Sequence, residues 1–240
     1  MTASCAYFIT GTDTDIGKTL IASAMLHVLA ENRIRAAGMK PVAAGAVLRD
    51  GALHNDDADA LAAAASVPLP VELATPYLLR EPASPHIAAA MEGIEIDPQH
   101  IQSCYDRVAG MAQAVVVEGV GGFRVPLTDR FDTADLAQQL GLPVVMVVGL
   151  RLGCISHALL TAEAIAARGL KLVGWAANVV DLSMQHGIAN LETLSARLPA
   201  PLLGCVPRLP AALPAAAAAH LDFSSLPGWP VVTAQRGSRE

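Results

Sequence analysis

The sequence is poor in aromatic residues, in charged residues and in basic clusters, and each shortage excludes a class of protein. Aromatic residues make up 4% of the 240 residues, so a core must be built mostly from Ala, Val, Leu and Ile. Charged residues make up only 16% and hydrophobic residues 53%, which excludes an intrinsically disordered chain. The net charge is −6 and the basic residues are scattered, so we expect no nucleic-acid partner.

Cysteines are also few, and they are widely separated. Cys5, Cys104, Cys154 and Cys205 form no C-x-x-C pair and have no histidines spaced around them as metal ligands. We interpret them as buried, reduced thiols. Apolar runs such as residues 144–148 are far too short to cross a bilayer, and no cationic leader precedes the first strand pattern. These features predict a soluble, cytoplasmic protein with no membrane partner.

What the sequence does contain is a regular alternation of short apolar runs and helical patterns. Continuous β-branched runs favour strands that are buried on both faces, as in a parallel sheet covered by helices. Strands joined by helices imply right-handed crossovers. We therefore expect an α/β fold with a mostly parallel sheet flanked by helices. Strands are predicted at residues 6–10, 36–40, 114–118, 144–150, 172–180 and 202–206, and helices from near Gly17 and over residues 133–140, 156–168 and 188–198.

Two regions interrupt this alternation. Residues 67–100 are rich in proline and lack a long periodic pattern, so we expect a loop-rich excursion over the edge of the sheet. After Pro207, the alanine run at residues 215–219 predicts a short helix, and residues 222–240 a loose C-terminal tail. No linker is long enough to divide the chain, so residues 1–240 are expected to form a single domain.

The decisive stretch is GTDTDIGKT at residues 11–19, which lies between an expected strand and an expected helix. That context is required of a loop that binds nucleotide phosphates. Gly17 lets the backbone approach phosphate oxygens, and amide groups at the start of a helix attract anions. Lys18 is placed to reach the β- and γ-phosphates, and Thr19 offers a hydroxyl to Mg²⁺. The loop departs from the common form G-x-x-x-x-G-K-[ST], because its first glycine stands one position early, at Gly11.

The loop therefore predicts a nucleoside triphosphate bound together with Mg²⁺, and such a site needs carboxylates from other strand ends. Glu118 ends the strand at residues 114–118 and precedes a glycine-rich loop, at the sheet edge where ligands bind. Lys40 ends another strand and either projects toward the same crevice or is an ordinary solvated lysine. The acidic residues 56–59 either join the metal shell or begin a helix whose dipole favours them.

Five further motifs follow the phosphate loop along the chain. They are KPVA at residues 40–43, SPH at 84–86, VEGVGG at 117–122, LGCI at 152–155 and GWAAN at 174–178. Together with the loop and its displaced glycine, they resemble the dethiobiotin synthetases of biotin biosynthesis. The resemblance covers roughly residues 5–209 and implies a homodimeric P-loop NTPase fold.

The resemblance also implies a reaction. ATP, Mg²⁺, CO₂ and 7,8-diaminononanoate would react through a carbamate and a carbamic–phosphoric anhydride, giving dethiobiotin, ADP and phosphate. Lys18 and Lys40 would be the catalytic residues around the transferring phosphoryl group. Mg²⁺ would be bound by Thr19, Asp57 and Glu118, with Asp57 preferred within the acidic group because its distance from the neighbouring motifs matches the family without a gap.

The family's nucleotide site would be formed by the phosphate loop, the loop after residue 118 and two later segments. Asn178 and the segment from Pro207 to Leu209 would hold the adenine. The implied ATP-binding residues are Asp15, Ile16, Gly17, Lys18, Thr19, Leu20, Glu118, Gly119, Gly121, Asn178, Pro207, Arg208 and Leu209.

The family's diamine site would be shared across the dimer, since the turn at residues 152–155 comes from the partner subunit and binds the distant carboxylate of the substrate. His86 is interpreted as a structural loop histidine more readily than as a base.

Two departures from the family pattern are Ala44, where a serine is common, and Arg151, where a lysine is common. The implied substrate residues are Thr14, Lys40, Ala44, Ser84, Pro85, Leu152, Gly153, Cys154 and Ile155.

Two other classes of P-loop protein are alternatives. A regulatory ATPase of the MinD type is the main alternative, but it usually carries an extra lysine early in the loop, and residues 12–16 contain none. Residues 211–221 also carry no lysine or arginine for a basic membrane helix. An amidotransferase-type synthetase acting on a corrinoid precursor would need a glutaminase domain, for which the chain has no room.

Overall fold

The computed structural model describes residues 3–230, and its centre is a six-stranded sheet in the order β10-β9-β8-β1-β7-β2. Every neighbouring pair in this sheet is parallel, which confirms the predicted α/β class. All six predicted strands are present, three of them with the predicted bounds. The strands are β1 (Cys5–Gly11), β2 (Ala36–Met39), β7 (Ala114–Glu118), β8 (Val144–Leu150), β9 (Leu172–Val179) and β10 (Leu202–Val206).

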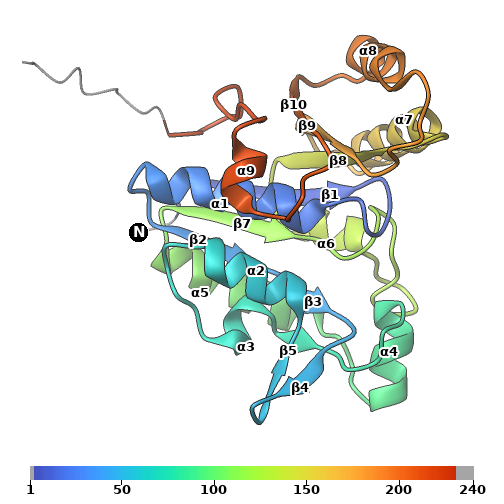
Figure 1. Cartoon of the computed structure of the whole chain (residues 1–240). Helices are drawn as coiled ribbons and strands as arrows, with labels where there is room; N and C mark the ends of the chain where they lie inside the picture. Colours follow the sequence, from blue (N-terminus) through green and yellow to red (C-terminus); the bar gives the residue numbers. More distant parts are fainter. Residues whose placement is uncertain (1–2, 231–240) are drawn as a thin grey trace, which may run out of the picture.

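Helices cover both faces of the sheet (Figure 1). One face is covered by α1 (Lys18–Glu31), α2 (Asp56–Ala64) and α9 (Pro214–Ala218), whose buried hydrophobic residues belong to one cluster. The buried residues of the helices on the other face belong to a second cluster. Those helices are α5 (Pro98–Met111), α6 (Thr133–Leu140), α7 (Cys154–Ala167) and α8 (Gly187–Arg197).

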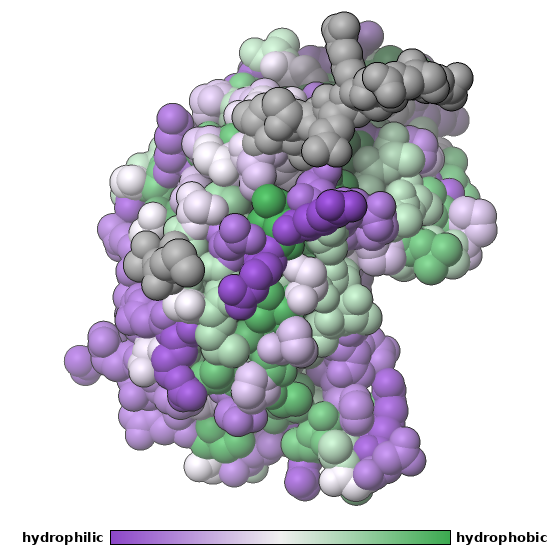
Figure 2. Space-filling model, turned by 90° about the vertical axis from the view of Figure 1, so that its left-hand side faces the viewer, coloured by the Kyte–Doolittle hydropathy of each residue, from purple (hydrophilic) through white to green (hydrophobic). Residues whose placement is uncertain are grey.

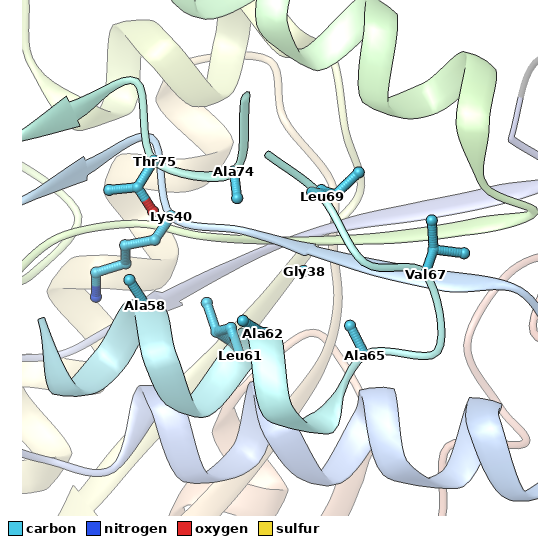
Figure 3. Close-up of a pocket in the computed structure, with 10 residues that line it drawn as sticks. All are labelled: Gly38, Lys40, Ala58, Leu61, Ala62, Ala65, Val67, Leu69, Ala74 and Thr75. Atoms are coloured by element: carbon cyan, nitrogen blue, oxygen red, sulfur yellow. The ribbon is translucent and has the colours of Figure 1, made fainter. Parts of the chain in front are cut away.

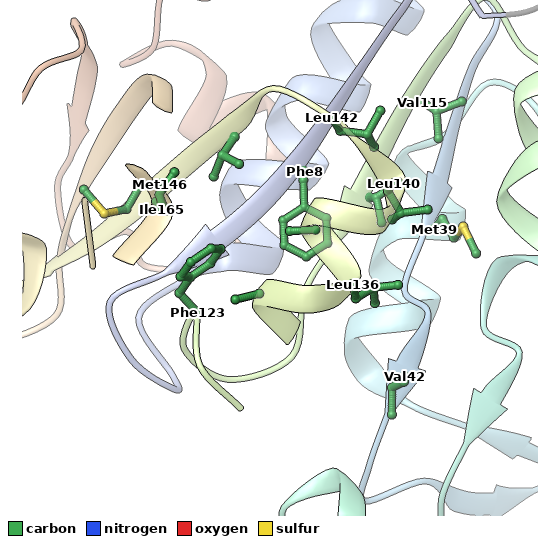
Figure 4. Packing of buried hydrophobic residues seen from close by; sticks show 14 of the residues in the cluster. Phe8, Met39, Val42, Val115, Phe123, Leu136, Leu140, Leu142, Met146 and Ile165 are labelled. Atoms are coloured by element: carbon green, nitrogen blue, oxygen red, sulfur yellow. The ribbon is translucent and has the colours of Figure 1, made fainter. Parts of the chain in front are cut away.

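Side-chain alternation along the buried strands explains why two clusters form. On β7, Val115 and Val117 join the cluster with Phe8, and Val116 between them joins the other. Successive side chains of a strand point to opposite faces, so a continuous valine run supplies both cores at once. Figure 4 shows the cluster that contains Phe8, where Phe8 packs near Leu136 of α6.

The expectation of a loop-rich segment at residues 67–100 is wrong in part. The segment contains α3 (Val71–Ala74), β6 (Tyr77–Leu78), α4 (Pro85–Glu92) and the start of α5. Its prolines do not break these helices, because Pro85 and Pro98 stand in the first helical turn, where a missing N–H costs nothing. Short strands border the segment, since β3 (Val42–Ala43) pairs with β6, and β4 (Val47–Arg49) forms a hairpin with β5 (Ala52–His54).

The predicted short helix near the C-terminus is confirmed as α9, but residues 222–230 are not a loose tail. Phe223 and Leu226 are each 3% exposed, and the Tyr7 hydroxyl donates to the carbonyl of Pro227 at 2.9 Å. The rings of Phe223 and Trp229 lie 4.9 Å apart. These buried residues are unevenly spaced along the chain, so no periodic sequence pattern predicts that the segment packs against the core. Residues 231–240 of the predicted tail lie outside the described residues.

The two ends of the sheet differ. At the amino ends of the strands, the Ser4 hydroxyl donates to the carbonyl of Gln113 at 2.8 Å, and Arg35 donates to the carbonyl of Met111 at 2.6 Å. Figure 2 looks onto this end and shows hydrophilic and hydrophobic residues intermixed. Among residues 3–230, no helix combines the length and the apolar character needed to cross a membrane. The candidate site lies at the opposite end, at the carboxyl ends of the strands.

Candidate functional site

The phosphate loop joins the carboxyl end of β1 to the start of α1. Gly17, at the helix N-cap, has a φ of 90°, a backbone conformation that favours glycine. A Cβ at this position would lie 2.3 Å from the side-chain nitrogen of Asn178. That nitrogen donates to the carbonyl of Ile16 at 2.9 Å, so Asn178 ties the loop to β9. The glycine therefore lets the loop turn and lets it rest against the neighbouring strand.

The displaced glycine has a local explanation. Thr12, where the common form has glycine, extends the β1 pairing, because its amide donates to the carbonyl of Val147 on β8 at 3.0 Å. A Cβ at Gly11 would instead lie 2.7 Å from the Ile16 side chain and 3.0 Å from that of Lys18. The close approach that requires glycine thus occurs at position 11, where the returning loop folds over the strand end.

Lys18 folds back onto the loop. Its ammonium group donates to the carbonyl of Asp13 at 2.8 Å, and the residue is 6% exposed. Burial, together with the nearby charge of Lys40, lowers the pKa of Lys18 to about 8. A bound phosphate would reverse this effect, since an anion favours the charged form of the lysine. The loop therefore holds a cation whose charge the protein alone compensates poorly.

Lys40 lies at the centre of a buried ionic network. Its ammonium group donates to Asp57 at 2.8 Å and to Glu118 at 2.5 Å. The Thr19 hydroxyl contacts the same two carboxylates, at 2.7 Å and 2.9 Å. Lys40 and Glu118 are 3% and 0% exposed. The structure thus brings together the second lysine, the loop threonine and both predicted metal-binding carboxylates, and of the acidic group 56–59 only Asp57 contacts Lys40 and Thr19.

The charges of this network depend on one another. Burial lowers the pKa of Lys40, but Glu118 and Asp57 outweigh it, and the net shift is upward. Burial raises the pKa of Asp57, but Lys40 and the Thr19 hydroxyl outweigh it, and the net shift is downward. Burial raises the pKa of Glu118 and prevails over the opposing effect of Lys40. The network thus contains one carboxylate that needs more positive charge than the protein supplies.

The donor set fits a magnesium ion. Oε2 of Glu118 is buried and has no hydrogen-bond partner, although a carboxylate oxygen in such a place is costly when it is left unpaired. Thr19, Asp57 and Glu118 present only oxygen ligands, which Mg²⁺ prefers, and Mg²⁺ usually keeps water and phosphate oxygens in its remaining positions. The described residues contain no group of three or more His, Cys, Asp or Glu for a metal held by protein alone.

A crevice of about 820 Å³ opens beside this network. Its wall includes the predicted substrate residues Thr14, Ala44, Ser84 and Pro85, which reach it from the phosphate loop, the residue after β3 and the start of α4. A second cleft, of about 310 Å³, adjoins the other side of the loop. Residues predicted to hold the adenine line that cleft together with loop residues: Asp15, Gly17, Leu20, Asn178, Pro207, Arg208 and Leu209.

The turn at residues 152–155 is not brought into the crevice of the same chain. The Leu152 side chain is 90% exposed, and Cys154 is buried at the start of α7. The amide of Cys154 donates to the carbonyl of Arg151 at 3.0 Å, so this group is already used within the turn. The amide of Cys154 is therefore not available to a ligand in this conformation of the turn.

Three features of the site escaped sequence analysis. Arg151, at the end of β8, forms an ion pair with Asp13 of the phosphate loop. Asn55 caps α2 and donates to the carbonyl of Ala44 at 3.0 Å, which holds Asp57 at the mouth of the crevice. Ala212 lines both clefts beside the loop. Only Asn55 had a sequence signal, since asparagine before an acidic run is typical of a helix N-cap.

Comparisons with known proteins agree with this geometry. Residues 5–216 match the model of a family described as an AAA domain. The ATP-dependent dethiobiotin synthetase BioD of Janthinobacterium sp. (strain Marseille) is 64% identical over 234 residues, which cover 96% of this chain and 99% of the relative.

Solved structures show the fold at much lower identity. A ParA family ATPase from Chlorobium tepidum TLS is 13% identical, with a TM-score of 0.56 over 90% of each chain. The cell division protein MinD of Aquifex aeolicus is also 13% identical, with a TM-score of 0.54 over 90% of this chain and 88% of that one. These likenesses establish a P-loop NTPase fold, and the dethiobiotin synthetase at 64% identity identifies the family. The chain belongs to the family of ATP-dependent dethiobiotin synthetases.

Proposed function

We propose that this protein forms dethiobiotin from 7,8-diaminononanoate, CO₂ and ATP. The observation that carries the proposal is the convergence of Lys18, Lys40 and Asp57 at one crevice that the segment around Ser84 also lines. Glu118 contacts Lys40 from within the core. The 64% identity to a dethiobiotin synthetase supports the same reaction. The MinD-type alternative rests on a shared fold at 13% identity, which says nothing of activity.

The reaction begins with a carbamate. One amine nitrogen of the diamine donates its electron pair to the carbon of CO₂, a C=O π pair moves to oxygen, and the nitrogen loses a proton to water. A carbamate oxygen then attacks the γ-phosphorus of ATP, and ADP leaves. The second amine attacks the carbonyl carbon of the resulting anhydride, phosphate leaves with the bonding pair, and the ureido ring closes with loss of a second proton.

Lys18 and Lys40 act on the second of these steps. Each is a buried cation beside the crevice, so each would neutralise charge on the carbamate and on the phosphoryl group between donor and acceptor. Charge neutralisation is strong here because the lysines lie in a region with little water. Positioning and electrostatics, rather than covalent participation of the protein, would lower the barrier.

Thr19, Asp57 and Glu118 would hold Mg²⁺, which when bound supplies further positive charge at the phosphate oxygens. The unpaired Oε2 of Glu118 supports this assignment. Lys40 already contacts both carboxylates, at 2.8 Å and 2.5 Å, and also lines the crevice, so it would lie between the metal shell and the transferring phosphoryl group. Asn178 and the segment from Pro207 to Leu209 would hold the adenine in the adjoining cleft.

The proposal includes a homodimer with shared sites and a cytoplasmic location. The crevice supplies lysines for the reacting end of the diamine, but the distant carboxylate needs a separate anion site. The turn at residues 152–155 begins α7, where amide groups attract anions, and it lies outside the crevice of its own chain. A partner subunit could bring it there. The free state of all four cysteines agrees with a reducing compartment.

The direct test is release of phosphate from ATP in the presence of bicarbonate and Mg²⁺, with and without 7,8-diaminononanoate. A synthetase releases phosphate only when the diamine is present, and the organic product gains one carbonyl carbon, which mass spectrometry with ¹³C-bicarbonate detects. Hydrolysis that is independent of the diamine, with no labelled product, would instead indicate a regulatory ATPase.

A further inference from the structure

A small cavity lies between α2 and the segment that runs from residue 67 to residue 75 (Figure 3). Of the residues that line this cavity, only Lys40 has a role in the mechanism described above. The wall is built mainly from small aliphatic side chains of α2 and of that segment. Its residues are Gly38, Lys40, Ala58, Leu61, Ala62, Ala65, Val67, Leu69, Ala74 and Thr75.

The size of the cavity suits a molecule of three heavy atoms. The centre of a water-sized sphere can move through about 20 Å³. A sphere of that volume has a radius of roughly 1.7 Å, and the radius of water adds about 1.4 Å, so the space extends roughly 3 Å from its centre. A linear triatomic molecule fits such a space, and a drug-sized ligand does not.

The chemistry of the wall disfavours water. A buried water molecule typically needs two to four polar partners. Two backbone amides of the wall are already used, since Lys40 donates to the carbonyl of Ala74 at 2.8 Å and Thr75 to that of Val71 at 2.7 Å. The Lys40 ammonium group is held by its two carboxylates, and in Figure 3 its nitrogen lies at the Ala58 end of the cavity, away from Val67 and Leu69. Thr75 and Lys40 therefore carry the polar side-chain groups of the wall, and its other side chains are aliphatic.

The cavity also borders the reaction site. Lys40 is the one residue that lines both the cavity and the 820 Å³ crevice. At the other end, Ala62 is exposed and Leu69 is half-buried, so the cavity has a mouth toward solvent on the side of α2. It therefore reaches Lys40 by a route that does not pass through the crevice occupied by the nucleotide and the diamine.

We infer that this cavity admits CO₂ and delivers it past the side chain of Lys40 to the substrate amine. The inference rests on the proposed function, in which CO₂ is a substrate. CO₂ is small, linear and uncharged, so it loses little on leaving water for an alanine-lined space. Bicarbonate is an anion, which such a wall would exclude. A separate entrance lets CO₂ arrive after the larger substrates have closed the crevice.

Two neighbouring alanines of α2 provide a matched test. Ala62 and Ala63 are both exposed, but only Ala62 lines the cavity. Leucine is a good helix former, so both Ala62→Leu and Ala63→Leu should fold. We expect Ala62→Leu to raise the KM for CO₂ several-fold without changing the KM for ATP or for the diamine. Ala63→Leu should leave all three unchanged, and Leu69→Ala, which widens the mouth, should not raise the KM for CO₂.

A structural measurement keeps this inference separate from the proposed function. Xenon binds apolar cavities, so crystals under xenon pressure should show a xenon atom here in the wild type and in Ala63→Leu, but not in Ala62→Leu. An ordered water in place of xenon, or an unchanged KM for CO₂ in Ala62→Leu, would overturn the inference while leaving the synthetase activity intact. Absence of diamine-dependent phosphate release by the wild type at any CO₂ concentration would instead remove the proposed function.

Discussion

At the scale of single residues, the fold treats the two site lysines differently. Lys18 is buried without a carboxylate in contact, and its pKa falls to about 8. Lys40 is buried against two carboxylates, and its pKa rises. The first lysine is thus prepared for an incoming anion, and the second is already neutralised by the protein. The two cations therefore need not have equal effects on catalysis.

Replacement of Lys18 by Ala is expected to lower turnover below about a tenth of wild type, because it removes charge that stabilises the transferring phosphoryl group. Thr19→Ala should lower turnover similarly by removing a predicted metal ligand. Steady-state phosphate release measures both effects, and circular dichroism checks folding. Lys171→Ala, at an exposed lysine, is the control. A Lys18→Ala enzyme that keeps more than a tenth of wild-type turnover would contradict the assigned role.

Replacement of Glu118 by Gln or of Asp57 by Asn should raise the Mg²⁺ concentration needed for half-maximal activity. Each change removes one negative charge from the proposed metal shell while the shape of the side chain is kept. Asp59→Asn is the matched control, because Asp59 pairs with His54 at 3.0 Å and not with Lys40. If Asp59→Asn raises the requirement and Asp57→Asn does not, the choice of Asp57 is wrong.

At the scale of secondary-structure elements, α6 shows how a short helix is held in the core beneath the site. Asp132 caps it by accepting from the amides of Ala134 and Asp135, each at 2.9 Å, and the Asp135 side chain accepts from the amide of Asp132 in return. Arg124 also pairs with Asp132. The cap fixes the helix start, and the helix then buries Leu136 and Leu140 under the sheet.

Asp132→Ala should therefore lower the free energy of unfolding by about 1 kcal/mol or somewhat more, and Asp132→Asn should cost less because asparagine also caps helices. Burial raises the pKa of Asp132, but the Asp135 amide and Arg124 outweigh it, and the net shift is downward. Its charge thus stabilises the fold above the unfolded pKa of about 4 and stops doing so as pH falls through the lower folded value. Urea unfolding of wild type and Asp132→Asn should differ at pH 7, and the difference should shrink as the pH is lowered below about 4.

At the scale of the whole molecule, one chain contains the proposed nucleotide half of the site and only part of the proposed diamine half. The phosphate loop and Lys40 line the crevice and Glu118 contacts Lys40, whereas the turn at residues 152–155 does not line it. A two-fold contact would join each crevice to the turn of the other chain and create two equivalent composite sites. This arrangement remains a prediction.

Mixing two inactive variants tests the shared site. Lys18→Ala disables the phosphate loop, and Gly153→Trp disables the turn, since Gly153 has a φ of 93° that a side chain would strain. A mixed dimer contains one site with both defects and one with neither, so activity should return after subunit exchange. Exchange is followed with two fluorescent labels. If the labels mix and activity stays at the background of either variant alone, the site is formed within one chain.

Much of this protein follows from local pattern. Continuous valine runs determined the buried strands β7 and β8, because side-chain alternation makes such runs stable only when both faces are covered. The glycine, lysine and threonine of the phosphate loop determined a nucleotide site, because each meets a requirement of anion binding that acts within a few residues. The prolines at the start of α4 and α5 gave a wrong prediction of a loop, since proline marks a helix start as readily as a loop.

Only the tertiary structure decided how distant residues combine. The sequence left Asp56, Asp57 and Asp59 open as metal ligands on residue reasoning alone, and the path of α2 past Lys40 brings Asp57 alone of the three into contact with it. Three other features also depend on residues that are far apart in the chain. They are the unpaired oxygen of Glu118, the ion pair between Arg151 and Asp13, and the cavity beside Lys40. Such features depend on close packing across elements, and no local periodicity records that packing.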